Sequence, residues 1–517
     1  MTLSLSAAGL LPLAPPALFL IAALLVAARR ERAVIWVNAT ALVAAVTTAT
    51  WFFAAGDSWQ AHALVSPAPA SHLVAVLITL LGLVISSFSR NYLAGEPRAR
   101  DYFVLLQLTL ASVALVVLTD HLLLLFAAWV GISLGLHQLL LFYPERPRAA
   151  LAAHKKFLFA RLAESTLLAA VLILYSVHGT WQISGIVAAY AAPGASLGTA
   201  EHIAAMLLAV TALIKCAQLP VHGWLIQVVE APTPVSALLH AGIINLGGYL
   251  LILFAPLLNL AAPAAWLLLV VAGLTTVLAS LIMTTRISIK VKLAWSTSAQ
   301  MGLMLIECAL GLYELALLHL LAHGCYKAYL FLNAGSAVEQ HLERKLAPRK
   351  LAKPFAWGVA VLIVAPTVAA AAWFVAPGGP ISPWLLLAAM LVLGLTERTN
   401  AATGRLPAAS LALTLILFVA YVSQKLAVGE AVPDAVPATG LGADIWVLGL
   451  IAFMSMGWYF LRRNTSHRPL ARRLNAWLFA GLFLDEWVSR MTLRLWPLRL
   501  PVRMRPKRLA ELGGEAK

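Results

Sequence analysis

Continuous apolar runs of about 20 residues recur along this chain and predict helices long enough to cross the ~30 Å hydrocarbon core of a bilayer. Their apolar positions do not alternate with polar ones, which argues against a membrane β-barrel. We therefore predict an all-α polytopic membrane protein with about fifteen transmembrane helices. The runs cover residues 7–28, 33–55, 72–89, 102–119, 121–143, 157–177, 202–219, 233–254, 264–283, 291–310, 313–337, 355–376, 383–396, 407–424 and 444–461.

Lysine and arginine fall in every second loop between these runs, which tests the count independently. The loops 56–71, 179–200, 255–263, 377–382 and 427–443 contain neither residue. Because short cytoplasmic loops carry the excess of positive charge, the N-terminus is expected outside and the C-terminus in the cytoplasm of a bacterial inner membrane. The basic loop residues are Arg29, Arg30, Arg32, Arg90, Arg98, Arg100, Arg146, Arg148, Lys155, Lys156, Arg286, Lys290, Lys292, Arg344, Lys345, Arg349, Lys350, Lys353, Arg398, Arg405, Arg462 and Arg463.

The composition agrees with a membrane protein. Hydrophobic residues make up 62% of the 517 residues and charged residues only 11%, with a mean hydropathy of +0.88, whereas soluble domains are about 25% charged. These values exclude a soluble enzyme and a disordered chain. The basic loops account for the net charge of +16, so we expect no nucleic-acid partner. The first run has no basic segment before it and is interpreted as a span rather than a signal peptide.

The chain divides into four parts. We predict N-terminal transmembrane helices in residues 1–101, a core in 102–426, the last transmembrane helix in 427–470 and a basic amphipathic tail in 471–517. The tail is either a surface helix on anionic membrane lipid or a docking site for a soluble partner. Its apolar residues at helical spacing are Leu474, Trp477, Leu478 and Leu482, and its basic residues are Arg490, Arg494, Arg499, Arg503, Arg505, Lys507 and Arg508.

Ionisable residues inside apolar runs are the main functional signal, because a charged side chain at mid-bilayer costs about 2.5–3.5 kcal/mol. Lys215 lies late in its run and either reaches the cytoplasmic interface or accepts protons in a relay. Pro232 and Pro234 predict an interrupted helix, of the kind that lines sites at membrane depth. His222 and Glu230 precede these prolines.

Histidines within the runs extend this signal. His240 follows the proline pair, where it is either a packing residue or part of a site. His319, His323 and Lys327 are spaced i, i+4, i+8, which places them on one helical face. Because histidine changes charge near neutral pH, the file favours a proton relay. A metal site would lack an obvious third ligand, and a structural role stays open.

Two shorter pairs have local explanations. Arg161 and Glu164, at i and i+3, form either a helix-end salt bridge or part of the polar path. Asp120 and His121 stand at the end of a run and are expected at the interface. Cys216, Cys308 and Cys325 form no CxxC motif, so the sequence signals neither a disulfide nor a cysteine-held metal.

Two motifs resemble the antiporter-like subunits of respiratory complex I and Mrp cation/proton antiporters. They are KCAQLPVHGWL with EAPTPVSALLHAG, residues 215–225 and 230–242, and HLLAHGCYKAYLFLNAGS, residues 319–336. The resemblance implies two inverted five-helix repeats, each with a broken helix. It also implies a central hydrophilic axis built from five of these residues, namely Lys215, His240, His319, His323 and Lys327.

The chain departs from that family in two places. The family usually has a glutamate after the tryptophan of the fifth span, but here Trp129 is followed by Val130. The second broken helix usually carries a lysine, yet no charged residue occurs from Pro354 to Thr396. We therefore expect Glu164 to replace the missing partner of Lys215, and Pro366 to preserve the second break.

Other segments resemble the membrane subunits of DAB inorganic-carbon accumulation complexes, the DabB family. They are HKKFLFARLAE at 154–164, NLGG at 245–248, FLDE at 483–486 and LWP at 495–497. The resemblance implies a soluble zinc partner, DabA, similar to β-carbonic anhydrase. Zinc is expected in that partner, and no cofactor or metal in this chain. This chain would conduct H⁺ or Na⁺ down its gradient and make hydration of CO2 to bicarbonate effectively one-way.

Two other functions remain open. The chain is alternatively a proton-pumping subunit of a complex I, hydrogenase or Mrp assembly, which the antiporter motifs also fit. A structural membrane anchor for an enzyme is the third possibility, favoured by the missing glutamate and lysine.

Overall fold

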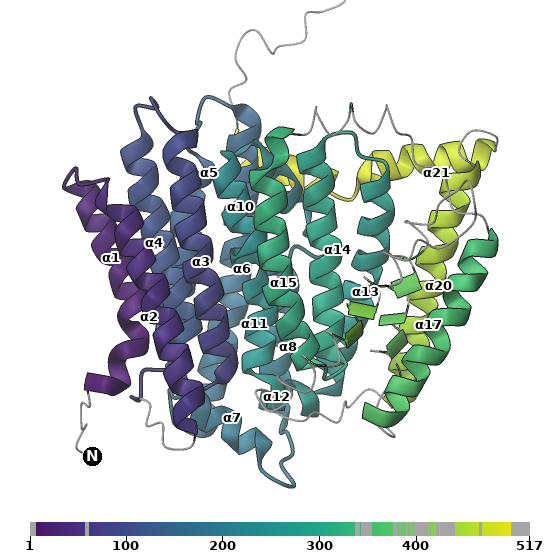
Figure 1. Ribbon diagram of the computed structural model, residues 1–517, viewed down its shortest axis with the longest axis horizontal. Coiled ribbons are helices and arrows are strands. Elements are labelled where there is room, and N and C mark those ends of the chain that lie inside the picture. Colours follow the sequence, from purple (N-terminus) through teal and green to yellow (C-terminus); the bar gives the residue numbers. More distant parts are fainter. Residues whose placement is uncertain are drawn as a thin grey trace, which may run out of the picture.

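A bundle of long helices, aligned side by side, forms the molecule (Figure 1). The computed structural model describes residues 7–56, 62–336, 342, 354–375, 440–464 and 468–497, with scattered positions between 381 and 423. The described residues form helices and turns, with two isolated β-bridges and no named strand. The long helices are α1 (Ala14–Ala27), α2 (Ala33–Ala55), α3 (Pro69–Tyr92), α4 (Ala99–Leu118), α5 (Leu122–Leu140), α6 (Pro147–His178), α8 (Thr199–Lys215), α13 (Ala262–Thr284), α14 (Ile289–Ala309), α15 (Tyr313–Leu332), α17 (Pro354–Val375) and α20 (Gly440–Asn464).

The multi-pass, all-helical class predicted from the apolar runs is confirmed. Among the described residues, eleven helices are long and apolar enough to cross a membrane. Helices α8 and α14 also coincide with predicted runs and pack in the same bundle. The predicted runs 383–396 and 407–424 lie largely outside the described residues, so the total of about fifteen stays a prediction.

Close helix contacts depend on glycine where two backbones approach. A Cβ placed on Gly135 of α5 would overlap the Thr109 hydroxyl of α4, and one on Gly302 of α14 would overlap Thr276 of α13. Small residues at helix contacts are typical of membrane bundles, where packing replaces the hydrophobic effect as the force between helices. These contacts hold α4 on α5 and α13 on α14.

The chain is interrupted immediately after Lys215. Helix α8 ends at Lys215, residues 216–222 are non-helical, and the chain resumes in α9 (Gly223–Gln227), η3 (Val228–Glu230), α10 (Thr233–Ala241), η4 (Ile243–Asn245), α11 (Leu246–Leu253) and α12 (Ala255–Leu260). In the segment Thr233–Leu253, 94% of the most apolar window is buried. This interrupted chain is therefore the centre of the bundle.

The structure shows an interruption at the proline pair and corrects the second expected break. The short helix η3 ends at Glu230 and α10 begins at Thr233, with Ala231 and Pro232 non-helical between them. Pro232 is the N-cap of α10 and Pro234 lies in its first turn, so both begin a helix, a position that tolerates the missing N–H of proline. A further interruption is the segment that follows Lys215. Helix α17 continues through Pro366, because membrane helices tolerate an interior proline. Pro366 therefore marks no break.

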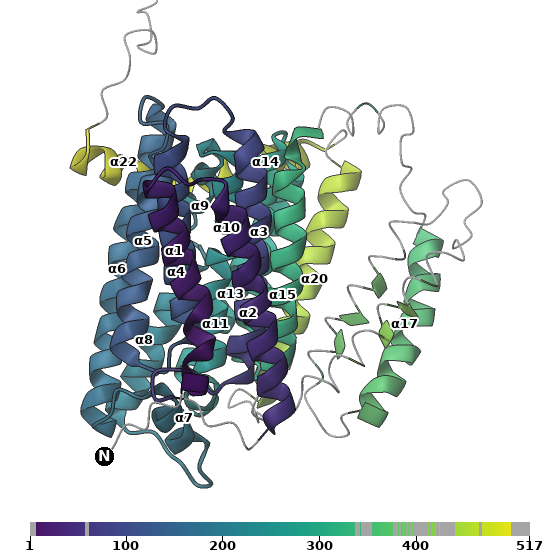
Figure 2. The same ribbon diagram turned by 60° about the vertical axis from the view of Figure 1, so that its left-hand side comes forward.

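After α20 the chain turns back across one end of the bundle. We call residues 469–495 the strap: it comprises α21 (Pro469–Phe479), η7 (Gly481–Phe483) and α22 (Glu486–Leu495). Figure 1 shows it in yellow along the upper edge, and Figure 2 shows α22 beside the end of α6. Leu474, Trp477 and Leu478 of the predicted pattern lie in α21, whereas Leu482 lies in η7 with a non-helical backbone (φ 55°), so the pattern does not continue as one helix. Residues 498–517, which hold its remaining arginines, lie outside the described part.

Candidate functional site

The first charged cluster surrounds Lys215 at the end of α8. Glu164 of α6 lies between two cations: its Oε1 is 3.7 Å from Lys215 Nζ, and its Oε2 is 2.6 Å from an Arg161 guanidinium nitrogen. The Glu164 side chain is 5% exposed. A buried carboxylate needs a compensating charge, and Glu164 lies within reach of Lys215. That it replaces the missing acid of the fifth span stays a prediction. Arg161 contributes more than a helix-end pair, since it shares that carboxylate.

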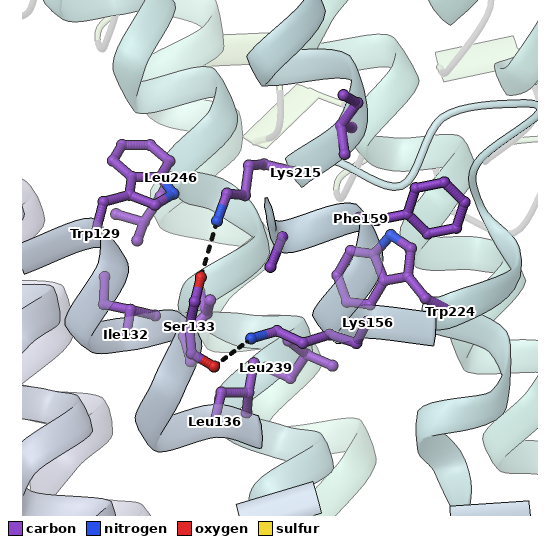
Figure 3. A pocket seen from close by; sticks show the side chains of 13 residues that line it. Trp129, Ile132, Ser133, Leu136, Lys156, Phe159, Lys215, Trp224, Leu239 and Leu246 are labelled. Atoms are coloured by element: carbon purple, nitrogen blue, oxygen red, sulfur yellow. Dashed lines mark hydrogen bonds between the residues drawn. The ribbon is translucent and has the colours of Figure 1, made fainter. Parts of the chain in front are cut away.

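A second buried lysine enters the same cluster from α6. Lys215 Nζ donates to Ser133 Oγ at 3.2 Å, and Lys156 Nζ donates to the Ser133 carbonyl at 2.7 Å, so the two lysines meet at one residue of α5 (Figure 3). They line a cavity of ≈ 30 Å³ with Trp129 and Trp224. Ser133, Lys156 and Lys215 are the polar residues of a lining that is otherwise largely apolar, and a volume of this size has room for about one or two water molecules.

Sequence reasoning placed Lys156 in a cytoplasmic loop. Helix α6 begins at Pro147, about two and a half turns before Lys156, so Lys155 and Lys156 are both helical. Both side chains are buried. The earlier start of this helix was indicated by Pro147, because proline is favoured in the first turn of a helix. The apolar run alone could not reveal it, because two lysines, a histidine and two arginines precede the run.

The second cluster lies along α15. The predicted file of His319, His323 and Lys327 faces the protein interior: His323 and Lys327 are buried, and the side chain of His319 is 12% exposed. His319 Nδ1 lies 3.0 Å from Glu307 Oε2 of α14. Lys327 Nζ donates to Ser296 Oγ at 2.8 Å. The file is thus anchored to α14 by a carboxylate and by a hydroxyl.

Glu307 was not identified from the sequence. It is 2% exposed and stands near the end of an apolar run, and no spacing rule links it to His319 on the next helix. The turn between α14 and α15 brings them together, since the two helices are antiparallel neighbours joined by Leu310–Leu312. His319 and Glu307 form an acid–imidazole pair that can hold a shared proton.

Four imidazole nitrogens in this cluster have no hydrogen-bond partner among the residues that the structure describes. They are Nδ1 and Nε2 of His240 and of His323, and all four are buried. His240 of α10 stacks on the Phe331 ring at 4.3 Å. A buried polar group left unsatisfied costs about 1–3 kcal/mol, so such groups normally bind ordered water. The geometry therefore calls for water beside both histidines.

Helix α10 separates the two clusters. Leu239 lines the Lys215 cavity, together with Ile243 and Leu246, whereas the adjacent His240 faces α15 through its contact with Phe331. Apolar side chains thus lie between Lys215 and His240. The five residues that the resemblance assigns to a hydrophilic axis thus fall into two polar groups on either side of this helix, and one continuous axis stays a prediction.

Two predicted residues lie away from both clusters. Glu230 is 3.8 Å from Arg148, which is 87% exposed, so this pair belongs to the rim of the bundle. His222 is buried at the start of α9, with its ring centroid 4.9 Å from that of Trp295. Within the described ranges no three His, Cys, Asp or Glu side chains are grouped to hold a metal, so His319 and His323 gain no third ligand there.

Known proteins share this architecture and much of this sequence. Residues 119–389 match the family described as NADH:quinone oxidoreductase/Mrp antiporter, TM. A probable inorganic carbon transporter subunit DabB from Hydrogenovibrio crunogenus is 51% identical over 434 residues, covering 84% of this chain and 83% of that protein. The probable inorganic carbon transporter subunit DabB2 from Halothiobacillus neapolitanus is 35% identical over 523 residues, covering 95% of this chain and 94% of that protein.

A solved structure shares the fold at lower sequence identity. The chain aligns with one in the Mrp complex from Dietzia sp. DQ12-45-1b with a TM-score of 0.60 and 22% identity, over 97% of this chain and 61% of that one. The antiporter-like fold predicted from the two motifs is confirmed by this match and by the family match.

Proposed function

Because this chain belongs to the DabB family of inorganic carbon transporter subunits, we propose that it conducts a cation, most simply a proton, and couples the electrochemical gradient to the accumulation of inorganic carbon. The partner in this proposal is a soluble zinc subunit of the DabA kind, which hydrates CO2 to bicarbonate. This chain supplies the membrane path, and the zinc belongs to the partner.

The observation that carries the proposal is the buried row of unpartnered imidazoles. His240 and His323 each present two buried ring nitrogens that no described residue hydrogen-bonds, beside Lys327. A purely packing role does not explain these histidines, because a leucine or phenylalanine at each position would avoid the cost of burying unsatisfied polar atoms. Imidazoles bridged by water can pass a proton by accepting it at one ring nitrogen and releasing another from the second.

The loop charges define a direction for this path. With the basic loops in the cytoplasm, the turn between α14 and α15 faces outside and the strap faces the cytoplasm. Protons then enter near Glu307 and His319 and pass His323, Lys327 and His240. Lys215 and Glu164 lie beyond α10 and receive the proton through water or a movement of that helix. Sodium is the alternative cation.

A pumping role in a complex I, hydrogenase or Mrp assembly is the second candidate. The match to the NADH:quinone oxidoreductase/Mrp antiporter family favours it. Against it stand Val130, where that family usually has a glutamate, and the uninterrupted α17. A purely structural anchor is disfavoured by the buried histidines and lysines, which an anchor does not need.

Uptake of inorganic carbon tests the proposal. We expect Lys215→Met and His323→Ala, each produced with the zinc partner in a carbonic-anhydrase-deficient bacterial host, to lower bicarbonate accumulation by about 100-fold, the lower end of what a positioned proton-transfer group contributes. Lys292→Met, which removes an exposed lysine of α14, is the matched control and should retain uptake. A protonophore should abolish uptake by the unmodified protein.

The same variants distinguish the three candidate functions. Retention of full uptake by both Lys215→Met and His323→Ala, with normal amounts of protein in the membrane, would support the anchor and refute the conducting role. Copurification with several other membrane subunits, and without a zinc protein, would support the pumping assembly.

A further inference from the structure

The strap is fastened to the bundle on both sides of α9. On one side, the Arg286 guanidinium donates to the carbonyls of Phe479 at 2.7 Å and Leu478 at 3.3 Å. These carbonyls lie at the end of α21, where they lack partners within the helix. The Arg286 guanidinium also lies over the Trp295 ring. The His222 ring contacts the same indole.

On the other side, an ion pair between a buried lysine and a partly exposed aspartate holds the start of α22. Lys155 Nζ donates to Asp485 Oδ2 and to Ser489 Oγ, both at 2.6 Å. The Lys155 side chain is 0% exposed. Gln227 of α9 donates to the same carboxylate oxygen at 3.1 Å. Because a buried ammonium without its counter-charge is strongly unfavourable, Lys155 needs Asp485, and Asp485 in turn joins α6 to α9.

The backbone of α9 is in direct contact with this carboxylate. A Cβ on Gly223 would overlap the Asp485 side chain, so only glycine leaves the strap room at this position. Helix α9 has five residues and cannot be stable by itself, since isolated helices shorter than about 12 residues are marginal. Its position therefore depends on its neighbours, of which the strap is one.

Helix α9 is joined to Lys215 by the non-helical residues 216–222. This segment is anchored at one end by α8 and at the other by Gly223 beneath Asp485. Displacement of α9 would therefore move the segment that ends α8, and with it the distance between Lys215 and Glu164. The remaining carboxylate oxygen, Asp485 Oδ1, and the nearby His222 Nδ1 are both buried, and no described residue hydrogen-bonds either atom.

We propose that Asp485 and Lys155 are positioning residues, whose ion pair clamps the strap onto α9 and thereby sets the place of Lys215 relative to Glu164. A chain that ends before the strap would keep the membrane bundle and lose this control. The transport part of this inference rests on the proposed function, and the structural part does not.

The test uses the full chain bound to its partner, with three changes that break the same clamp. They are Lys155→Met, Asp485→Asn and Gly223→Ala, and the matched control is Glu486→Gln, the same carboxylate-to-amide change at the exposed neighbouring residue. Amide hydrogen exchange in residues 216–227 should rise by about tenfold or more in each variant, since a charged hydrogen bond restrains local opening by at least that factor. Glu486→Gln should match the unmodified protein.

Transport gives the second readout. Each clamp variant should lower bicarbonate uptake several-fold and shift the pH dependence of uptake, because the surroundings of Lys215 change. Combining Lys155→Met with Asp485→Asn should do no further harm, since both remove one interaction. Asp485→Asn keeps the size of the side chain, so it reports on the clamp even if Lys155→Met fails to fold.

Three results separate this inference from the proposed function. Unchanged exchange in residues 216–227 of folded Asp485→Asn would overturn the clamp. Faster exchange with an unchanged uptake rate and pH profile would overturn the positioning role. If Lys215→Met itself retained uptake, the proposed function would fail, while the exchange result would still decide whether the clamp exists.

Discussion

Glu164 is shared by two cations, and this defines the chemistry around Lys215. The carboxylate lies 2.6 Å from Arg161 and 3.7 Å from Lys215, so Arg161 is the closer partner. Lys215 has its hydrogen bond to Ser133 instead. A lysine held loosely by its counter-charge can release a proton at a smaller cost than one in a tight ion pair. The arrangement thus suits a group that changes its charge during transport.

A double-mutant cycle measures whether Glu164 and Lys215 act together. We expect Glu164→Gln and Lys215→Met each to impair bicarbonate uptake and the double variant to be no worse than the more severe single one. Contacting charges show coupling of about 0.5–3 kcal/mol, whereas independent sites add. The measurement is the uptake rate of the four proteins at equal membrane abundance. Clear additivity would mean that the pair is not a functional unit.

Functional residues could be predicted from the sequence where titratable side chains recur at helical spacing or where a family residue is missing. His319, His323 and Lys327 fall on one face because the helical repeat fixes their direction, and Glu164 was reached from the absence of an acid at Val130. Lys156, Ser133 and Glu307 could not be found in this way. Their roles arise from contacts between different helices, and a serine or a helix-end lysine is common in any membrane protein.

At the scale of elements, the non-helical segment 216–222 lies against the close contact between α13 and α14 at Gly302. The carbonyl of Ala272 in α13 and the side chain of Gln218, in the interrupted segment, both lie close to Gly302. Gln218 also donates to the Ser298 carbonyl of α14 at 3.3 Å. The segment that follows Lys215 is therefore held by α14 as well as by the strap.

Gly302→Ala should destabilise the bundle. The added methyl group would overlap the Thr276 hydroxyl and the backbone of α13, and overpacking of this kind costs about 1–3 kcal/mol. Gly449→Ala in α20 is the matched control, since its Cβ would meet nothing within 4 Å. Thermal unfolding in detergent should show a lower midpoint for Gly302→Ala only. Equal midpoints for the two variants would contradict the close α13–α14 contact.

Element positions were predictable to the extent that they follow hydropathy. Each predicted run within residues 7–337 coincides with one of the observed helices or helix pairs. The length of α6, the short α9 and the continuity of α17 through Pro366 were missed. In each case tertiary packing decided the outcome: α6 extends where its lysines meet Ser133 and Asp485, and α9 persists where the strap covers it.

At the scale of the whole molecule, the strap joins the last span to α6, which the chain entered more than 300 residues earlier. Part of the strap remains available to other surfaces. Trp477, Phe483 and Trp487 are 57%, 56% and 52% exposed, beside exposed arginines at 472, 473, 490 and 494. Aromatic and arginine side chains on one amphipathic element suit a lipid headgroup region and a protein partner alike. Both interpretations of the tail therefore stay predictions.

The orientation of the chain decides whether the strap can face a cytoplasmic partner. The loop charges place residues 93–98 inside and residues 192–198 outside. We expect Ser196→Cys to react with a membrane-impermeant maleimide in intact cells and Ala94→Cys to react only after permeabilisation. Both positions are exposed. The background should carry Cys325→Ser, because Cys325 is exposed while Cys216 and Cys308 are buried.

This labelling pattern bears on every step of the proposed coupling. If Ser196→Cys is reached from outside, the strap and the Asp485 clamp lie in the cytoplasm, on the side where a soluble zinc subunit could bind, and Glu307 with His319 lies toward the proton source. The reverse pattern would place the strap outside the cell. A cytoplasmic partner could then not act through α9, and the gradient would enter at the Lys215 end of the bundle.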